Sequence, residues 1–270
     1  MIIEKLVSKK SNLYNNLKPF FKIAGERVDQ LGLIHLFSIW TLVVAGIVVK
    51  MHSNDRFIYW DWSDSFSGLI KLIFATFIFI KYLFPKKVWL AGIKILSNNE
   101  ILKHSIVALF LIIFGFLDTQ INISSLILII PYLLVFVSCL MIFQFKLILD
   151  EKNGTWDIVQ WKNKNLILAI SFSLMLFSVI LGIFFDDPIV STAGMVSSPY
   201  AIIALLWPNH VRHMQRARFY PLFTFAMFLC VRAPWFILPT FTLFFSLRVI
   251  NYFRYGIAYP SFAVDFLDDE

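Results

Sequence analysis

Residues 207–221 hold the side chains that could most readily support chemistry in this sequence. In a helix, His210 and His213 share one face at a spacing of three residues, and Arg212 and Arg216 share a neighbouring face. Arginine forks bind phosphate groups in a bidentate manner, and histidine exchanges protons near neutral pH. The pattern therefore indicates a site for a phosphate-bearing lipid, a nucleotide or a lipid-linked sugar.

This hypothesis assigns two roles within the stretch. The candidate acid–base residues are His210 and His213. The candidate substrate-binding residues are Asn209, Arg212, Arg216 and Arg218. The alternative is a basic connection that only orients its neighbouring helices, because basic connections stay in the cytoplasm. The sequence leaves both interpretations open.

Four histidines are expected near the cytoplasmic interface, where neutral imidazoles could bind a metal ion or haem. They are His35, His104, His210 and His213. The chain has no Glu-x-x-His or His-Glu-x-x-His motif, and both cysteines, Cys139 and Cys230, lie inside apolar runs. The sequence therefore predicts no metal site and identifies no cofactor.

The elements that must position these side chains are apolar runs whose connections differ sharply in charge. The connections at 51–66, 118–124 and 186–191 contain Arg56 as their only Lys or Arg, together with several aspartates. Cytoplasmic connections of multi-pass proteins carry the excess of Lys and Arg. The opposite, basic set is therefore predicted to be cytoplasmic. It comprises 1–30, 81–103, 146–164, 212–218 and 248–254.

Composition agrees with a membrane environment. The chain is 59% hydrophobic and 15% charged and contains 30 phenylalanines. A soluble domain is about half apolar and about a quarter charged, so this much apolar surface exceeds what a core of this size can bury. The net charge of +7 is dispersed among connections, which favours anionic lipid headgroups over nucleic acid as the partner. Two cysteines are too few for a disulfide framework.

Eight segments are predicted to cross the membrane, each near the ~20 residues that cover ~30 Å of hydrocarbon. The run 217–255 is divided because Pro234 cannot continue a helical backbone, and the resulting hairpin returns Arg248 and Arg254 to the basic side. A re-entrant loop in place of the first half of this run stays open. The predicted crossings are 31–49, 67–84, 101–117, 125–149, 165–185, 190–207, 217–232 and 235–253.

The predicted fold class is therefore all-α: a polytopic integral membrane bundle of about eight transmembrane helices with both termini cytoplasmic. Amphipathic surface helices are expected over 2–22, where a disordered basic tail is the alternative, and over 85–103. Three regions follow from this division. They are a cytoplasmic-face segment 1–30, a transmembrane domain 31–255 and an acidic tail 256–270.

Two basic residues fall within apolar runs, where an unpaired ion is expensive. Lys71 is expected to extend to the interface or to meet Asp61 or Asp64, and Arg232 to be neutralised by the aspartates of 186–187. The crossing 190–207 is rich in small and polar residues, which either permit close helix packing or line a substrate path.

Three functions fit these observations. A transporter permease, or an integral subunit of a larger complex with partner protein subunits, fits the short connections and the lack of Walker and dinucleotide motifs. The first alternative is an inner-leaflet enzyme that acts on a phosphate-bearing lipid through the 209–218 cluster. The second is a structural membrane anchor. A bacterial inner membrane is the expected location, and an organellar membrane stays open.

Overall fold

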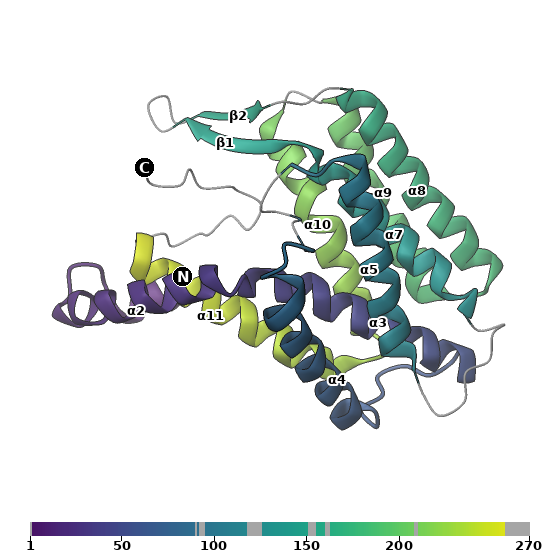
Figure 1. Cartoon of the computed structure of the whole chain (residues 1–270), viewed down its shortest axis with the longest axis horizontal. Coiled ribbons are helices and arrows are strands. Elements are labelled where there is room, and N and C mark those ends of the chain that lie inside the picture. The colour runs from purple at the N-terminus through teal and green to yellow at the C-terminus, as the bar shows by residue number, and fades with distance from the viewer. Residues whose placement is uncertain are drawn as a thin grey trace.

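The chain folds into a helical bundle with one short β-hairpin (Figure 1). The computed structural model describes residues 2–89, 91, 95–117, 126–150, 155–159, 163–207 and 210–256, with the backbone alone at 2, 146–150, 155–159 and 211–212. The helices are α1 (Ile2–Leu6), α2 (Asn12–Gln30), α3 (Leu36–Asn54), α4 (Ser65–Ile78), α5 (Asn98–Phe116), α7 (Ile129–Met141), α8 (Lys164–Phe184), α9 (Pro188–Leu206), α10 (Val211–Leu229) and α11 (Ile237–Tyr255). Short 3-10 turns at Leu33–His35, Ile142–Gln144 and Pro234–Phe236 adjoin α3, α7 and α11, and a π-helical turn at Phe79–Leu83 extends α4.

Six of the described helices are long and apolar enough to cross a membrane. They are Leu33–Asn54, Ser65–Leu83, Asn98–Phe116, Lys164–Phe184, Pro188–Leu206 and Pro234–Tyr255. The predicted helical class is therefore confirmed, in the form expected of a multi-pass membrane protein. The two remaining predicted crossings coincide with α7, which is shorter, and with α10, whose first turns carry arginine and histidine.

The amphipathic N-terminal helix does not follow its predicted bounds. The chain leaves the helical conformation after Leu6, and a new helix begins at Asn12 and continues to Gln30. Ser11 caps this second helix by accepting a hydrogen bond from the backbone N–H of Tyr14 at 3.2 Å. The prediction of one continuous helix over 2–22 is therefore wrong, because the helix is interrupted after Leu6 and its second part ends at Gln30.

Two further boundaries differ from the sequence prediction. The described residues between 84 and 97 are not helical, so the predicted surface helix over 85–103 is wrong there, and α5 begins with a capping box of Ser97 and Glu100. The predicted crossing 125–149 is helical only as far as Gln144. It continues into strand β1 (Lys146–Asp150), which pairs antiparallel with β2 (Thr155–Val159).

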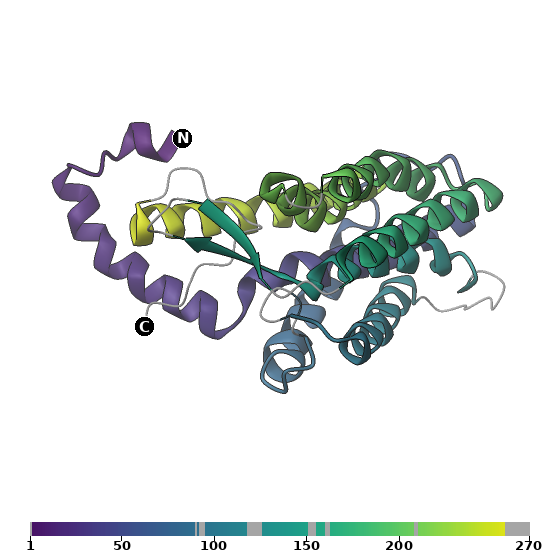
Figure 2. The same ribbon diagram turned by 90° about the horizontal axis from the view of Figure 1, so that it is seen from above.

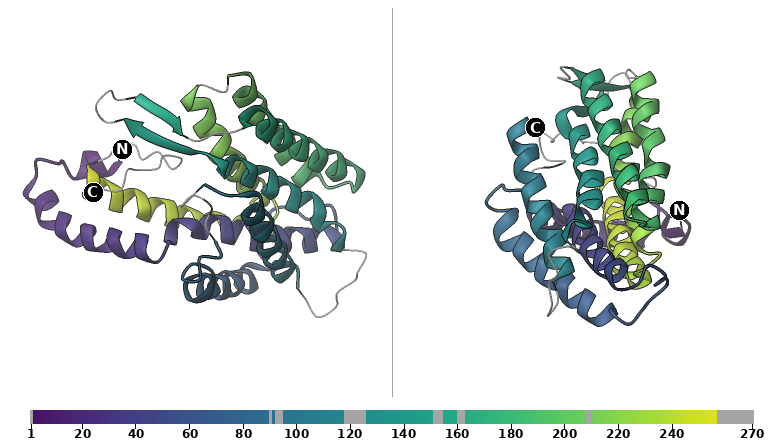
Figure 3. Two further views of the ribbon diagram at one scale, coloured as in Figure 1. Left: turned by 45° about the horizontal axis from the view of Figure 1, so that its top comes forward. Right: turned by 90° about the vertical axis from the view of Figure 1, so that its right-hand side faces the viewer.

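Close helix contacts hold the bundle together. α3 is buried along most of its length and crosses α5 where Gly46 faces Gly115. A Cβ on either glycine would lie 1.9 Å from a backbone oxygen of the other helix, so the two backbones touch directly. On the other side of the bundle, α8, α9 and α10 lie side by side as a layer (Figures 1 and 3). Ser138 of α7 and Ser171 of α8 join these helices through hydrogen bonds from each hydroxyl to the other residue's carbonyl oxygen.

α2 bends away from the bundle and packs along the last turns of α11 (Figure 2). The Tyr14 hydroxyl donates to the carbonyl oxygen of Tyr252 at 3.2 Å, and the Tyr252 hydroxyl donates to that of Val7 at 2.6 Å. Burial raises the pKa of Tyr14, and an ion pair between Arg254 and Asp29 closes the contact. These interactions bind the N-terminal segment to the C-terminal helix.

The connections gather at two ends of the molecule. The β-hairpin, α2 and the end of α11 lie toward the left of Figure 1, whereas the α3–α4, α8–α9 and α10–α11 connections lie toward the lower right. Hydrogen bonds join the second group, because the backbone N–H groups of Trp60 and Asp61 donate to the carbonyl oxygens of Val231 and Arg232. The described connections therefore gather at two ends, and those at 51–66 and 186–191 share one of them, whereas 118–124 lies outside the described residues.

Candidate functional site

The structure brings part of the predicted His/Arg cluster together at the start of α10. The ring centres of His210 and His213 are 4.3 Å apart, and Trp207 lies 6.0 Å from His213. Partial burial and the nearby His210 and Arg216 side chains lower the pKa of His213, whose Nδ1 is buried without a hydrogen-bond partner in the described chain. This environment favours the neutral imidazole of His213 over its charged form.

The arginines of the cluster separate: Arg216 lies close enough to His213 to affect its pKa, whereas Arg218 packs elsewhere. Arg216 is exposed, while Arg218 is buried with its guanidinium carbon 4.7 Å from the ring centre of Phe143 and 6.0 Å from that of Phe145. Arg218 thus helps to pack α10 against the end of α7. Asn209 lies outside the described residues, and only the backbone of Arg212 is described.

The interfacial histidines are separated in the fold. His104 is buried against Trp89, and His35 lies beside Phe84, away from the His210–His213 pair. Among the described residues, no group of three or more His, Cys, Asp or Glu side chains is arranged to hold a metal ion.

A second polar cluster surrounds Arg232, which is fully buried in the turn between α10 and α11. Its Nη2 donates to the carbonyl oxygen of Arg56 at 2.9 Å and lies 3.3 Å from Nδ1 of His52, and its guanidinium faces the ring of Tyr59. In the described part of the chain, its Nε and Nη1 have no hydrogen-bond partner. This cluster joins the α10–α11 turn to the end of α3.

The aspartates expected to neutralise Arg232 have other partners. Asp186 forms an ion pair with Arg56, and Asp187 accepts a hydrogen bond from the Tyr132 hydroxyl at 2.7 Å. The predicted pairing is therefore wrong in its partners, although all these groups lie at the same end of the bundle. Lys71 likewise donates to the carbonyl oxygens at the end of α5, at 2.6 Å to Gly115 and 3.0 Å to Leu117.

The small residues of α9 serve close packing. A Cβ on Gly182 of α8 would lie 2.9 Å from the backbone nitrogen of Ser191, and one on Gly194 would lie 2.7 Å from Val179. Ser197 and Ser198 are buried as well. Of the two interpretations offered for this segment, the contacts support helix packing.

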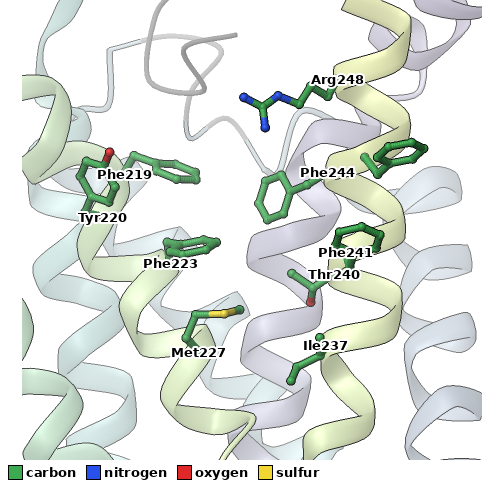
Figure 4. Close-up of a pocket in the computed structure, with 10 residues that line it drawn as sticks. Phe219, Tyr220, Phe223, Met227, Ile237, Thr240, Phe241, Phe244 and Arg248 are labelled. Atoms are coloured by element: carbon green, nitrogen blue, oxygen red, sulfur yellow. The ribbon is translucent and has the colours of Figure 1, made fainter. Parts of the chain in front are cut away.

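The most distinctive cavity is an aromatic groove between α10 and α11, of about 370 Å³ (Figure 4). Its volume falls in the range of about 300–1,000 Å³ typical of ligand sites. The two helices diverge from their turn, and side chains from both point into the space between them. The lining residues are Phe219, Tyr220, Phe223, Met227, Ile237, Thr240, Phe241, Phe244, Phe245 and Arg248. We call this feature the α10–α11 groove.

The Phe37 ring of α3 packs against both arms of the groove, and Phe244 of α11 also contacts Phe219 and Phe223 of α10 directly. The Phe37 ring centre lies 6.3 Å from Phe223 on α10 and 4.8 Å from Phe244 on α11. On the open side, Phe241 is 65% exposed and Phe245 is 50% exposed. Arg248 extends from α11 toward α10 at the wide end (Figure 4), and its buried Nε has no hydrogen-bond partner among the described residues.

The fold and these sites define a helical multi-pass bundle with a laterally open groove. Comparison with protein-family models, with curated proteins and with solved structures finds no match for this chain.

Sequence reasoning missed the groove, although its residues were visible. Arg248 entered the sequence prediction only through the orientation of the hairpin, and the phenylalanines of 219–245 were assigned no role. The available signal was a phenylalanine-rich hairpin with arginine near the basic end of each arm. That signal does not reveal whether the arms pack together or diverge.

Proposed function

We propose that the chain is an eight-crossing membrane protein with both termini cytoplasmic. Helices at all eight predicted positions support this topology, as does the separation of the connections into two ends. In this arrangement residues 31–255 form the transmembrane domain and 1–30 a cytoplasmic-face segment. We keep the bacterial inner membrane as its proposed location.

Within that topology, we propose a permease-type role, or a role as the membrane-integral subunit of a larger complex. The protein takes up an amphipathic molecule from the bilayer through the α10–α11 groove. The observation that carries this proposal is the groove itself, which is walled by aromatic rings, exposed along one side and ends at a cation. A lateral opening of this kind admits a ligand directly from lipid.

The two alternatives receive less support from the geometry. An enzyme using the 209–218 cluster needs its arginines near the histidine pair, yet Arg218 is buried against Phe143. A structural anchor needs no cavity, whereas the groove leaves Thr240 Oγ1 and Arg248 Nε buried without hydrogen-bond partners in the described chain. Partner subunits that supply catalysis or energy are a further expectation, which copurification in mild detergent tests.

Site-specific photo-cross-linking tests the groove as the functional surface. A benzophenone side chain in place of Phe241 faces the groove, and the same replacement of Phe74, 57% exposed on α4, serves as the matched control. After purification and extensive detergent exchange, illumination should give a lipid-sized adduct at position 241 well above that at 74. Equal adduct yields at the two positions would contradict the proposal.

A further inference from the structure

The wide end of the α10–α11 groove carries a cation on each wall. Arg248 belongs to α11 and lines the groove. Arg216 of α10 lies four residues before Tyr220 and seven before Phe223, so it shares their groove-facing side of the helix, one turn nearer the wide end. Helical spacing thus places Arg216 at the same end of the groove as Arg248.

Neither arginine has an anionic partner in the described part of the chain. Arg216 is exposed, and the Nε of Arg248 is buried without a hydrogen bond. A cation at the edge of the hydrocarbon region is expensive unless an anion accompanies it. Guanidinium groups bind phosphate strongly through paired charge-assisted hydrogen bonds. The entrance thus has the chemistry of a phosphate site.

The rest of the groove has the chemistry of hydrocarbon. Below the arginines the walls present Phe219, Phe223, Met227, Phe244 and Ile237, and Phe37 of α3 packs against Phe223 and Phe244. Such a surface contacts alkyl groups closely and offers few hydrogen bonds. A ligand that fits both parts is an amphiphile with an anionic head.

The dimensions fit one leaflet of a bilayer. Arg216 to Met227 and Ile237 to Arg248 each comprise twelve residues, and the eleven steps between their ends cover about 16 Å at ~1.5 Å per residue. The hydrocarbon core is ~30 Å thick, so the groove is about as long as the acyl region of one leaflet. Both arginines lie at the basic end of the hairpin, which selects the leaflet on that side.

We propose that the α10–α11 groove binds one anionic phospholipid of the leaflet on the basic side. Its acyl chain lies along Phe219, Phe223 and Phe244, and its phosphate lies between Arg216 and Arg248. This inference rests on the proposed function and names the ligand of the same groove. Binding places a phosphate beside both guanidinium groups and fills the gap between the diverging helices.

Lipid retention by the full-length protein tests the proposal. The protein is purified in detergent micelles doped with phosphatidylglycerol or with phosphatidylcholine, and bound lipid is counted by native mass spectrometry. The double variant R216Q/R248Q removes both entrance cations. The variant K22Q/R27Q removes the same charge from two exposed positions of α2 and is the matched control.

The wild type and K22Q/R27Q should retain phosphatidylglycerol about tenfold better than R216Q/R248Q does, as expected when charge-assisted hydrogen bonds are lost. Phosphatidylcholine should be retained less by the wild type. Equal retention of phosphatidylglycerol by R216Q/R248Q would overturn the proposal. Displacement of the lipid by millimolar inorganic phosphate would overturn it too, because it would indicate a site for free anions.

Failure of this inference can be told apart from failure of the proposed function. A strong adduct at position 241 without a headgroup preference leaves the groove as the functional surface and refutes the anionic phospholipid. The absence of any adduct above the control at position 74 refutes the function itself. An adduct that maps to residues 257–270 of this chain would refute both, because the tail would be the occupant.

Discussion

The contact between α3 and α5 allows one prediction to be worked out from distances. In Gly115→Ala the new Cβ would lie 1.9 Å from the carbonyl oxygen of Val43, whereas ordinary contact begins at 3.4 Å. The helices must therefore separate by the difference, 1.5 Å, because a backbone oxygen cannot rotate away. Overpacking of this kind lowers the free energy of unfolding by about 1–3 kcal/mol. We expect the upper end of this range, because the obstructing atom belongs to the backbone. The melting temperature should fall by roughly 6–12 °C.

The assay is thermal unfolding of the purified protein in detergent, followed by intrinsic tryptophan fluorescence. Gly194→Ala is the matched control, because its Cβ would meet the side chain of Val179 at 2.7 Å, which can rotate, and the nearest backbone oxygen only at 3.6 Å. Gly46→Ala should lower the melting temperature about as much as Gly115→Ala. The double variant should lower it by less than the sum of the two single variants, because both substitutions separate the same pair of helices. Small and equal changes in melting temperature for Gly115→Ala and Gly194→Ala would refute the close crossing of α3 and α5.

Three further predictions concern single side chains. Tyr14→Phe removes the hydroxyl bonded to the end of α11, at a cost of about 1 kcal/mol, and should speed hydrogen exchange across α2; unchanged exchange would contradict the contact. Thr240→Val removes a buried hydroxyl that has no partner among the described residues. This substitution should raise the melting temperature by roughly 2–4 °C. A lower melting temperature would contradict this expectation, because it would show that the hydroxyl forms a hydrogen bond. His213 has a pKa below its ordinary 6.5, so the folded state binds fewer protons and its stability declines as the pH falls below 6.5. His213→Gln should therefore lose less stability than the wild type between pH 7.5 and 5.5, and identical losses would contradict the lowered pKa.

Long apolar runs explain how much of the fold could be predicted. A run of about 20 residues has few stable alternatives to a helix in lipid. The break at Pro234 was equally predictable, because proline cannot donate the next hydrogen bond of a helix. The structure begins a new helix there, through the turn Pro234–Phe236. The long apolar helices and the break at Pro234, whose conformation is set by local sequence, were thus predicted correctly.

The β-hairpin was missed although its signal is local. Asn153-Gly154 precedes a run of β-branched and aromatic residues at 155–159, which is a hairpin signal. The apolar residues Leu147–Leu149 were instead read as the end of a crossing. Hydrophobicity alone cannot distinguish a strand that leaves the membrane from the last turn of a helix.

The α10–α11 groove could not have been predicted from one sequence. Its phenylalanines recur at helical spacing, which is equally typical of two helices packed on each other. The decisive contact is with Phe37, nearly two hundred residues away, which packs against both arms. The partners of Arg232 were missed for the same reason, because His52 belongs to a distant helix.

The central claim is that the basic connections, and with them the wide end of the groove, share the cytoplasmic face. Labelling with a membrane-impermeant maleimide tests it most directly. In a C139A/C230A background, single cysteines replace exposed residues at the two ends: Phe57 and Val231, and Lys86 and Arg216. Cysteines at 57 and 231 should react in intact cells, and those at 86 and 216 only after permeabilisation. Reaction at 216 but not at 231 in intact cells would contradict the account, because the groove would then open on the opposite face.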